Sequence, residues 1–200
     1  KLGKKLFITG KGRCNVTNAA DMDVLFDSVR SNAKFLYSAF YGYDNRAVMG
    51  FMEREGCTLK TERGGRVFPV SDHSSDVIAV FQRSLKKNGV EIRLRTEARR
   101  LLGEDKIHGV ELRDGQVLLA DAVIVCTGGL SYPGTGSTGD GLRFAEETGH
   151  KVIECRPSLV PLETAEKWCG DLMGLSLKNV GLRMAQGGRE LYREQGEMLF

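Results

Sequence analysis

The chain has 200 residues, of which 41% are hydrophobic and 28% charged, a composition typical of a globular protein with a substantial core. The net charge of +3, from 29 basic and 26 acidic residues spread along the chain, gives no global argument for a nucleic-acid partner. No apolar run is long enough to cross a bilayer and no signal-peptide pattern opens the chain, so we predict a cytoplasmic protein without a membrane partner. The chain begins without methionine and stops inside an apolar run, and we therefore expect an internal segment of a longer protein.

The first half of the chain predicts mainly helices. Residues 6–9 (LFIT) form a short apolar run that we expect to be extended. Apolar side chains then recur at helical spacing over residues 22–40, with Asn18 or Asp21 as the expected cap, and Asp44 is expected to cap the next helix.

The middle of the chain predicts short strands before and after one helix. Residues 58–70 predict two extended segments around a two-glycine turn, and a helix is expected to begin at Ser74 or Ser75 and to end at Asn88. Residues 90–94 (VEIRL) predict a strand, and residues 98–120 predict three short strands joined by turns.

A buried strand and a glycine-rich segment follow. Residues 122–129 (AVIVCTGG) are apolar without interruption, which favours a central strand of a layered, parallel sheet. A short helix is expected over residues 142–148. Beyond Arg156 the composition changes, and we place a domain boundary near Pro157, with two strands around the Gly187–Gly188 turn after it.

The cysteines are scattered and form no CxxC pair. This spacing predicts neither a zinc cluster nor a thioredoxin-type redox pair. An odd number of separated thiols fits the reducing cytoplasm. The five residues are Cys14, Cys57, Cys126, Cys155 and Cys169.

The stretch GKGRCNVTN, residues 10–18, is the first candidate binding loop. Gly10 and Gly12 give a G-x-G pattern, but Asn15 stands where a dinucleotide fingerprint has its third glycine. The acidic ribose ligand expected about 20 residues later is absent, and no Walker A sequence follows. By itself the loop is either an anion cradle or a plain surface turn.

The stretch CTGGLSYPGTGSTGDG, residues 126–141, is the second candidate loop. Glycine loops at the carboxyl ends of parallel strands bind ligands, because backbone N–H groups can approach phosphate oxygens without a Cβ in the way. Asp140 can cap the following helix or accept hydrogen bonds from ribose or ribityl hydroxyls. The alternative is a flexible loop with a capping aspartate.

The chain resembles the HI0933-like family of bacterial flavoproteins in five motifs that occur in the same order. They are GKGRCNVTN, GRVFPVSD, CTGGLSYPGTGSTGDG, PSLVPL and GLSLKNV. Members of this family are called NAD(P)/FAD-dependent oxidoreductases or aminoacetone-oxidase-like enzymes, and one branch is associated with bile-acid reduction. The TGG…TGDG segment is also similar to the flavoprotein subunits of succinate dehydrogenase and fumarate reductase.

The resemblance implies an α/β fold with a partial FAD/NAD(P)-binding domain of the glutathione-reductase type, Rossmann-like and carrying a β-meander. Residues 1–156 would belong to this domain, without its first βαβ unit and GxGxxG loop. Residues 157–200 would begin an inserted, β-rich domain on the substrate side. FAD is the implied cofactor, with NAD(P)H or oxygen as its electron partner.

The resemblance also implies which residues contact FAD. The first loop would line the pyrophosphate and isoalloxazine side, Ala98 would offer its backbone to the adenine, and Asp140 would stand in the position of an acidic flavin ligand. The implied contacts are Gly12, Arg13, Cys14, Asn15, Thr17, Asn18, Ala98, Thr127, Gly128, Gly129 and Asp140. We further expect Arg13 to stabilise negative charge on the reduced flavin.

These observations predict an FAD-dependent oxidoreductase with a small-molecule substrate and no nucleic-acid partner. No metal site is expected, and no residue stands out as a general acid or base. A non-catalytic nucleotide- or RNA-binding module using Lys11 and Arg13 is one alternative, although no aromatic platform accompanies that loop. A flavin-binding sensor is another. Residues 1–200 alone are expected to retain FAD weakly or not at all.

Overall fold

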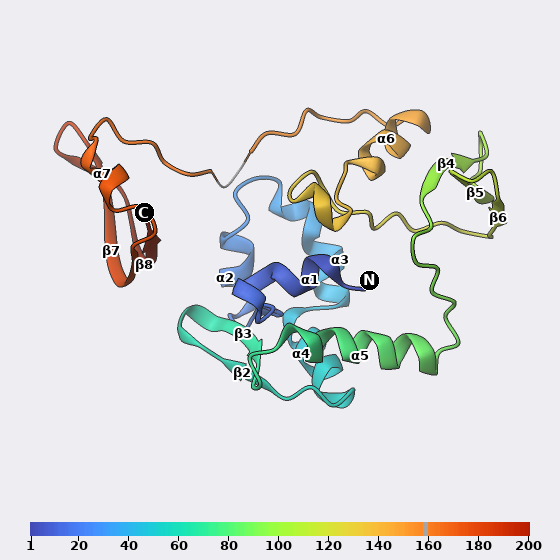
Figure 1. Ribbon diagram of the computed structural model, residues 1–200, viewed down its shortest axis with the longest axis horizontal. Helices are drawn as coiled ribbons and strands as arrows, with labels where there is room; N and C mark the ends of the chain where they lie inside the picture. Colours follow the sequence, from blue (N-terminus) through green and yellow to red (C-terminus); the bar gives the residue numbers. More distant parts are fainter. Residues whose placement is uncertain (158–159) are drawn as a thin grey trace. The chain divides into compact units, whose positions relative to one another are not determined.

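The computed structural model describes residues 1–157 and 160–200, which fall into two compact units, Lys1–Val152 and Ile153–Phe200 (Figure 1). Ser158 and Leu159, in the PSLVPL motif, lie outside the described residues. The assignment of one part to cofactor binding and the other to the substrate stays a prediction. No helix in the described part of the chain is long and apolar enough to span a membrane.

The first unit opens with short helices, as the apolar spacing of residues 22–40 predicts. Asp44 caps α4 as expected, because its carboxylate accepts a hydrogen bond of 2.7 Å from the N–H of Ala47. Asp21 is the N-cap residue of α2, without a side-chain hydrogen bond to the helix. The elements are α1 (Lys4–Ile8), η1 (Thr9–Gly12), α2 (Met22–Asp27), η2 (Ala33–Leu36), α3 (Tyr37–Gly42) and α4 (Asn45–Arg54).

The extended segment expected over residues 6–9 is wrong, because Lys4–Ile8 forms α1. A four-residue apolar run does not distinguish a strand from a turn of helix, and the decision falls to packing. Leu6 of α1 lines a small apolar pocket together with Leu2, which precedes the helix, and Ile78 of α5. This contact with α5 favours the helix.

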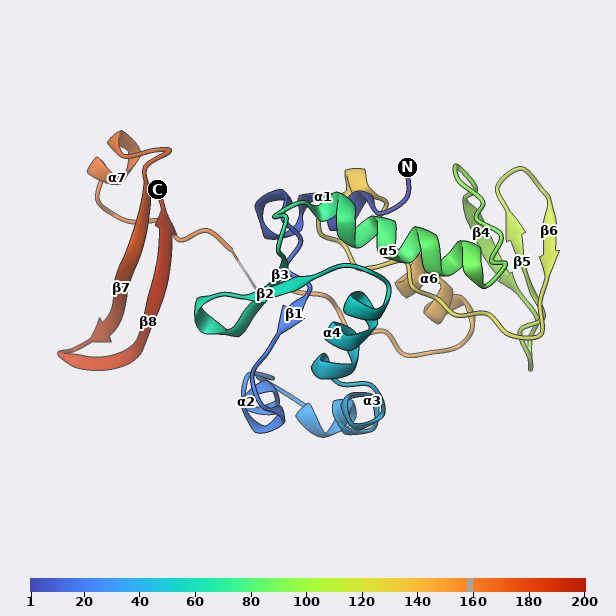
Figure 2. The same cartoon turned by 90° about the horizontal axis from the view of Figure 1, so that it is seen from below.

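A three-stranded antiparallel sheet forms the centre of the first unit. Its strands β1 (Thr17–Asn18), β2 (Leu59–Thr61) and β3 (Arg66–Pro69) have the order β1-β3-β2, so β3 pairs on both edges. Both α4 and α5 (Ser74–Lys87) pack against this sheet (Figure 2). The paired segments are confirmed, and α5 ends before Asn88 as predicted, but its N-cap is His73 and not a serine.

The core of this unit joins the first loop to α4 and α5. Phe68 and Val67 of β3 are buried, as are the apolar positions of α5 that face the sheet. One cluster of buried residues contains Cys14, Met52, Cys57, Val77 and Val80. Cys14 therefore anchors the first loop to the core of this unit.

The β-meander is confirmed as a second antiparallel sheet of three strands. The strands are β4 (Ala98–Leu102), β5 (Gly109–Leu112) and β6 (Val117–Leu119), in sequential order. Arg99 and Arg100 of β4 both pair with Glu111 of β5, at 2.8 and 2.7 Å. These ion pairs support the central strand.

Two predicted strands are not formed in the described structure. Residues 90–94 and 122–129 have no strand assignment, and Ile124 is 87% exposed. A strand exists only when its N–H and C=O groups pair with a neighbour, and all strand pairs of the described residues are antiparallel pairs of other segments. The apolar composition of residues 122–129 suits a central strand, but by itself it does not make the segment a strand.

The glycine-rich segment ends at α6 (Asp140–Glu147), after a 3-10 turn η4 (Pro133–Thr135). The helix begins two residues earlier than predicted, because Gly139, with φ of 85°, is its N-cap residue. It ends before Gly149 as expected.

The second unit consists of α7 (Trp168–Asp171) and a long hairpin of β7 (Ser176–Gln186) and β8 (Arg189–Leu199). The two predicted strands are confirmed, with the turn at Gly187 and Gly188. None of the residues described between Ile153 and Phe200 is buried.

Candidate functional site

The first loop closes on itself through its own backbone. The N–H of Arg13 donates to the carbonyl of Gly10 at 3.2 Å, and the N–H of Cys14 donates to Thr9 at 3.0 Å. Lys11 and Cys14 both have positive φ, 58° and 61°, which most side chains avoid. Since the N–H groups of Arg13 and Cys14 already have acceptors within the protein, the loop does not present them to an anion.

Arg13 reaches away from the loop into a cluster of charged side chains. Its guanidinium lies 2.8 Å from Glu62 and 3.2 Å from Asp72, and 4.0 Å from the ring centre of Phe68. Lys60 completes the cluster at 2.6 Å from Asp72. We call Arg13, Lys60, Glu62 and Asp72 the charge cluster.

Within the charge cluster, the carboxylates of Glu62 and Asp72 balance the positive charge of Arg13. Hydrogen bonding to Glu62 raises the pKa of Arg13, although partial burial opposes this. Hydrogen bonds from Lys60 and Arg13 hold the pKa of Asp72 below its usual value. The expected role of Arg13 beside a reduced flavin stays a prediction, and the structure adds a second role: the side chain fastens the loop to Glu62, directly after β2, and to the turn after β3.

Cys14 points into the core. Its side chain packs with Met52 and Val80, and only 2% of the residue is exposed. Burial raises the pKa of the Cys14 thiol, which keeps it protonated and unreactive. Any contact of this residue with a ligand would involve its backbone.

The remaining predicted residues of the first loop attach it to β3 and the two-glycine turn. Thr17 pairs with Val67 in the sheet. Asn18 donates from its amide to the carbonyl of Gly64 at 2.8 Å and accepts from the N–H of Ala20 at 2.9 Å. With its NH2 group turned toward them, Asn15 donates to the carbonyls of Val67 and Thr17. These three residues define the shape of the loop.

The second loop folds back on itself at its glycines. A Cβ on Gly128, whose φ is 77°, would lie 2.9 Å from the Ser137 hydroxyl oxygen. A Cβ on Gly141 would lie 2.6 Å from the Thr127 hydroxyl oxygen. Both distances are too short for a side chain, so the two ends of the loop approach closely only because glycine stands there.

Asp140 stands where the second loop becomes a helix. Its carboxylate accepts from the Thr138 hydroxyl at 2.7 Å and from Arg143 at 3.2 Å. These contacts lower the pKa of Asp140, the hydrogen bond from Thr138 contributing most. A quarter of the side chain is still exposed, which leaves an ionised carboxylate able to accept further hydrogen bonds from hydroxyls.

A lysine that the sequence analysis missed connects α1 to the second loop. Lys5 of α1 donates to the carbonyl of Ser131 and lies 5.1 Å from the ring centre of Tyr132. Ala98 lies elsewhere, in β4, paired with Leu112. The structure thus places α1 against the second loop, while the described contacts do not join Ala98 to either loop.

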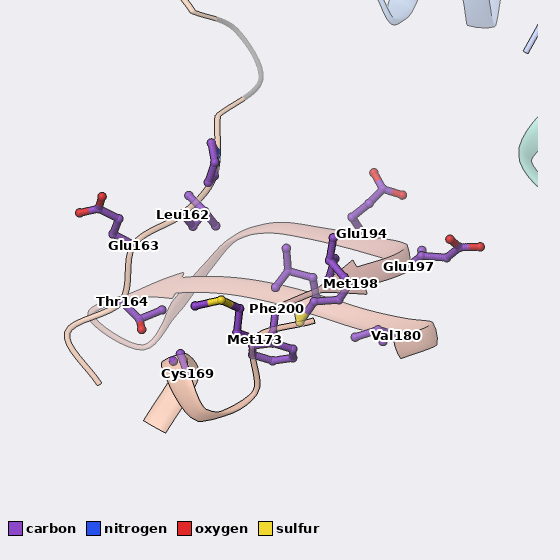
Figure 3. Close-up of a pocket in the computed structure, with 15 residues that line it drawn as sticks. Leu162, Glu163, Thr164, Cys169, Met173, Val180, Glu194, Glu197, Met198 and Phe200 are labelled. Atoms are coloured by element: carbon purple, nitrogen blue, oxygen red, sulfur yellow. The ribbon is translucent and has the colours of Figure 1, made fainter. Parts of the chain in front are cut away.

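The second unit contains an apolar pocket of about 840 Å³ between α7, residues 161–164 and one face of the hairpin. Figure 3 shows Met173, Met198 and Phe200 together in this pocket, facing Leu162. We call this feature the hairpin pocket. The sequence analysis did not find it, because its lining comes from three separate segments.

Sequence signals existed for some of the missed residues. Lys60 and Glu62 are two residues apart in a predicted strand, which places them on one face. This pattern indicates a charged strand face, but it does not identify Arg13 as the partner, 49 residues away from Glu62. Asp72, in a turn with φ of 58°, gave no such signal.

Comparison with known proteins identifies the family. The HI0933-like protein Rossmann domain matches residues 1–198. The chain belongs to the HI0933-like family. Its fold class is therefore Rossmann-like α/β, and the described part of this fold shows helices with small antiparallel sheets.

Three relatives are similar to most of the chain. A ribosomal RNA dihydrouridine synthase of Haemophilus influenzae is 31% identical over 88% of the chain and 45% of its own length. A 3-dehydro-bile acid delta(4,6)-reductase of Clostridium scindens is 34% identical, over 81% of the chain and 39% of its own length. A ribosomal RNA dihydrouridine synthase of Escherichia coli is 27% identical over 80% of the chain and 39% of its own length. The chain spans less than half the length of these relatives.

Proposed function

We propose that the protein is an FAD-dependent oxidoreductase that reduces a carbon–carbon double bond with electrons from NAD(P)H. The family match over residues 1–198 carries this proposal, because Rossmann-type domains bind dinucleotides. The names of the relatives support the reaction type. A delta(4,6)-reductase and a dihydrouridine synthase both add hydrogen across a double bond.

The chain offers groups that fit part of FAD. No atom outside the neighbouring residues lies within 4 Å of a Cβ built on Gly129, and only the carbonyl oxygen of Phe7, at 4.0 Å, meets one built on Gly12. Both positions therefore have space for a ligand at the backbone. Asp140 supplies an ionised carboxylate for ribose or ribityl hydroxyls.

The residues of the chain would bind and orient, while FAD would carry the electrons. The net reaction adds one hydride from NAD(P)H and one proton from water to the two carbons of the double bond. Asp140 would hold the sugar hydroxyls, and the glycine backbone at Gly12 and Gly129 would approach the pyrophosphate. The charge cluster would keep the first loop in place.

The substrate class has two candidates. A small organic molecule agrees with the bile acid reductase relative and with the small net charge of the chain. A uridine in ribosomal RNA is favoured by one specific observation: two of the three relatives carry the name ribosomal RNA dihydrouridine synthase. We propose the small molecule as the first candidate and ribosomal RNA as the second.

The test uses the complete protein that contains this chain. We expect a yellow protein whose flavin absorbance is bleached by NADH or NADPH without oxygen and restored by an unsaturated substrate. A colourless protein that FAD cannot reconstitute would overturn the proposal and favour the RNA-binding module. A flavin that binds but accepts no electrons from NAD(P)H would favour the sensor. Restoration by ribosomal RNA lacking dihydrouridine, and not by steroid enones, would select the second substrate class.

A matched pair of variants in α6 tests the role of Asp140. Asp140 and Glu147 both contact Arg143, at 3.2 and 2.7 Å, but only Asp140 adjoins the second loop. We expect Asp140→Asn to weaken FAD binding at least tenfold and Glu147→Gln to leave it unchanged, measured by FAD titration of the apoprotein. Equal affinities of the two variants would remove Asp140 from the cofactor site.

A further inference from the structure

We propose that Ser137 of the second loop is a further cofactor-binding residue, whose hydroxyl donates a hydrogen bond to an oxygen of the ribityl–pyrophosphate chain of FAD. The sequence analysis named Asp140, three residues later, and did not name Ser137. That the ligand is FAD rests on the proposed function. That the Ser137 hydroxyl is available to a ligand rests on the structure alone.

The Ser137 side chain is buried, but its hydroxyl has no partner among the described residues. Only 5% of Ser137 is exposed, and no hydrogen bond joins its hydroxyl to residues 1–157 or 160–200. Hydroxyls that are buried to this extent are usually hydrogen-bonded, because burial removes the water that would otherwise bind them. A bound ligand would supply the missing partner.

The hydroxyl oxygen of Ser137 remains within reach of a ligand. In the part of the chain that the structure describes, every side-chain nitrogen or oxygen that is closed off from solvent has a hydrogen-bond partner. Since the Ser137 oxygen has no such partner, it is not closed off and keeps some contact with the surface. The side chain is thus held in place by burial while its polar atom stays accessible.

Gly128 shows in which direction the hydroxyl points. A Cβ built on Gly128 would lie 2.9 Å from the hydroxyl oxygen of Ser137 and 3.6 Å from its Cβ, so the hydroxyl is turned toward Gly128. A Cβ built on the next residue, Gly129, meets no atom within 4 Å outside the neighbouring residues. This open space at the Gly129 backbone is where the inference places the acceptor oxygen of FAD.

Neighbouring hydroxyls of the second loop are already used within the protein. Thr135 donates to a backbone carbonyl at 2.7 Å, and Thr138 donates to the carboxylate of Asp140 at 2.7 Å. Ser131 is exposed, so water can satisfy its hydroxyl. Among the hydroxyl groups of this loop, that of Ser137 is the one that is both buried and without a partner in the described structure.

The closed ends of the second loop fix the position of the hydroxyl. Gly141 approaches Thr127 closely, since a Cβ on Gly141 would lie 2.6 Å from the Thr127 hydroxyl oxygen. Together with the approach of Gly128 to Ser137, this contact holds the start of the loop against its end. A donor that is already held in one position loses little conformational entropy when a ligand binds.

The experiment titrates the apoprotein of the complete protein with FAD and compares Ser137→Ala with Ser131→Ala. Ser137→Ala removes one hydroxyl and adds no atom, and we expect about three- to tenfold weaker FAD binding from the loss of one hydrogen bond. Ser131→Ala is the same substitution at an exposed position of the same loop and should leave the affinity unchanged.

Two further measurements on Ser137→Ala separate binding from structure. The thermal midpoint of the apoprotein should be unchanged, because the hydroxyl has no partner in the described part of the protein. The absorption spectrum of the bound flavin should also be unchanged, because the hydroxyl contacts the ribityl–pyrophosphate chain and not the isoalloxazine ring.

The outcomes distinguish this inference from the proposed function. Equal FAD affinities of Ser137→Ala and the unchanged protein, where that protein takes up reducible flavin, would overturn the role of Ser137 and leave the oxidoreductase standing. A lower thermal midpoint of the apoprotein with unchanged FAD affinity would assign the hydroxyl to a contact within the protein and overturn it as well. A shifted absorption maximum would place the hydroxyl at the flavin ring, against the proposal. A complete protein that takes up no FAD would overturn the proposed function, and the role of Ser137 with it.

Discussion

The two units use their apolar residues in opposite ways. In the first unit, Phe68, Val77 and Val80 are almost completely buried around the sheet and α5. In the second unit, a hairpin of two long strands leaves its apolar side chains exposed around a cavity. Two-stranded hairpins are marginally stable in water, so apolar contacts on one face are needed for stability. The difference teaches that the first unit has a buried apolar core, whereas the described part of the second unit has none.

The largest expected effect compares one buried and one exposed apolar residue. Phe68→Ala should lower the free energy of unfolding by about 3–5 kcal/mol, because it leaves a cavity beneath the first loop. Leu199→Ala should change it by less than about 0.5 kcal/mol, because that side chain is mostly exposed. Urea unfolding, followed by far-UV circular dichroism and by Trp168 fluorescence, measures both. A large loss of unfolding free energy for Leu199→Ala would show that its side of the hairpin is covered, and would contradict the contrast between the two units.

A smaller effect compares one glycine of each unit, both with a similar positive φ. Gly65 and Gly188 have φ of 73° and 79°, but a Cβ on Gly65 would lie 2.4 Å from the Asn18 amide oxygen, whereas Gly188 has open space. Gly188→Ala should cost about 1 kcal/mol from backbone strain alone. Gly65→Ala should cost about 1–3 kcal/mol more, because Asn18 must leave its hydrogen bonds. Equal losses in thermal unfolding would mean that Asn18 does not hold the first loop.

The smallest effect concerns the pH dependence of the charge cluster. The pKa of Asp72 is lowered in the folded protein, so its ion pairs stabilise the fold above its unfolded pKa, near 4, and are lost as the pH falls through the folded value. Asp72→Asn should therefore lower the thermal midpoint at neutral pH and lose this difference in strong acid. Asp105→Asn, at an exposed position of the meander, is the control. A deficit that persists unchanged into strong acid would mean that charge is not the cause.

Elements whose interactions are local in sequence could be predicted well. The Asp44 cap of α4, the end of α5 before Asn88 and the hairpin around Gly187 each depend on residues within one or two turns of chain. The family resemblance was confirmed in the same way, since it rests on contiguous motifs. The cofactor residues stay predictions.

Elements that depend on distant partners could not be predicted. Residues 122–129 have the composition of a central strand, yet no strand of the described structure pairs with them. LFIT became α1 through contact with α5, about 70 residues later in the chain. Apolar composition specifies that a segment prefers burial, but hydrogen-bonding partners decide its secondary structure.

The sequence by itself determined the family, the positions of the glycine loops and most helices and hairpins, because these follow from contiguous motifs, caps and turns. Only the tertiary structure decided how the first loop is held. Arg13 turned out to pair with Glu62 and Asp72, and Cys14 to point into the core. The hairpin pocket also exists only in three dimensions, since α7, β7 and β8 each contribute part of its lining. Contacts between separate segments depend on how the chain folds back, which no local pattern encodes.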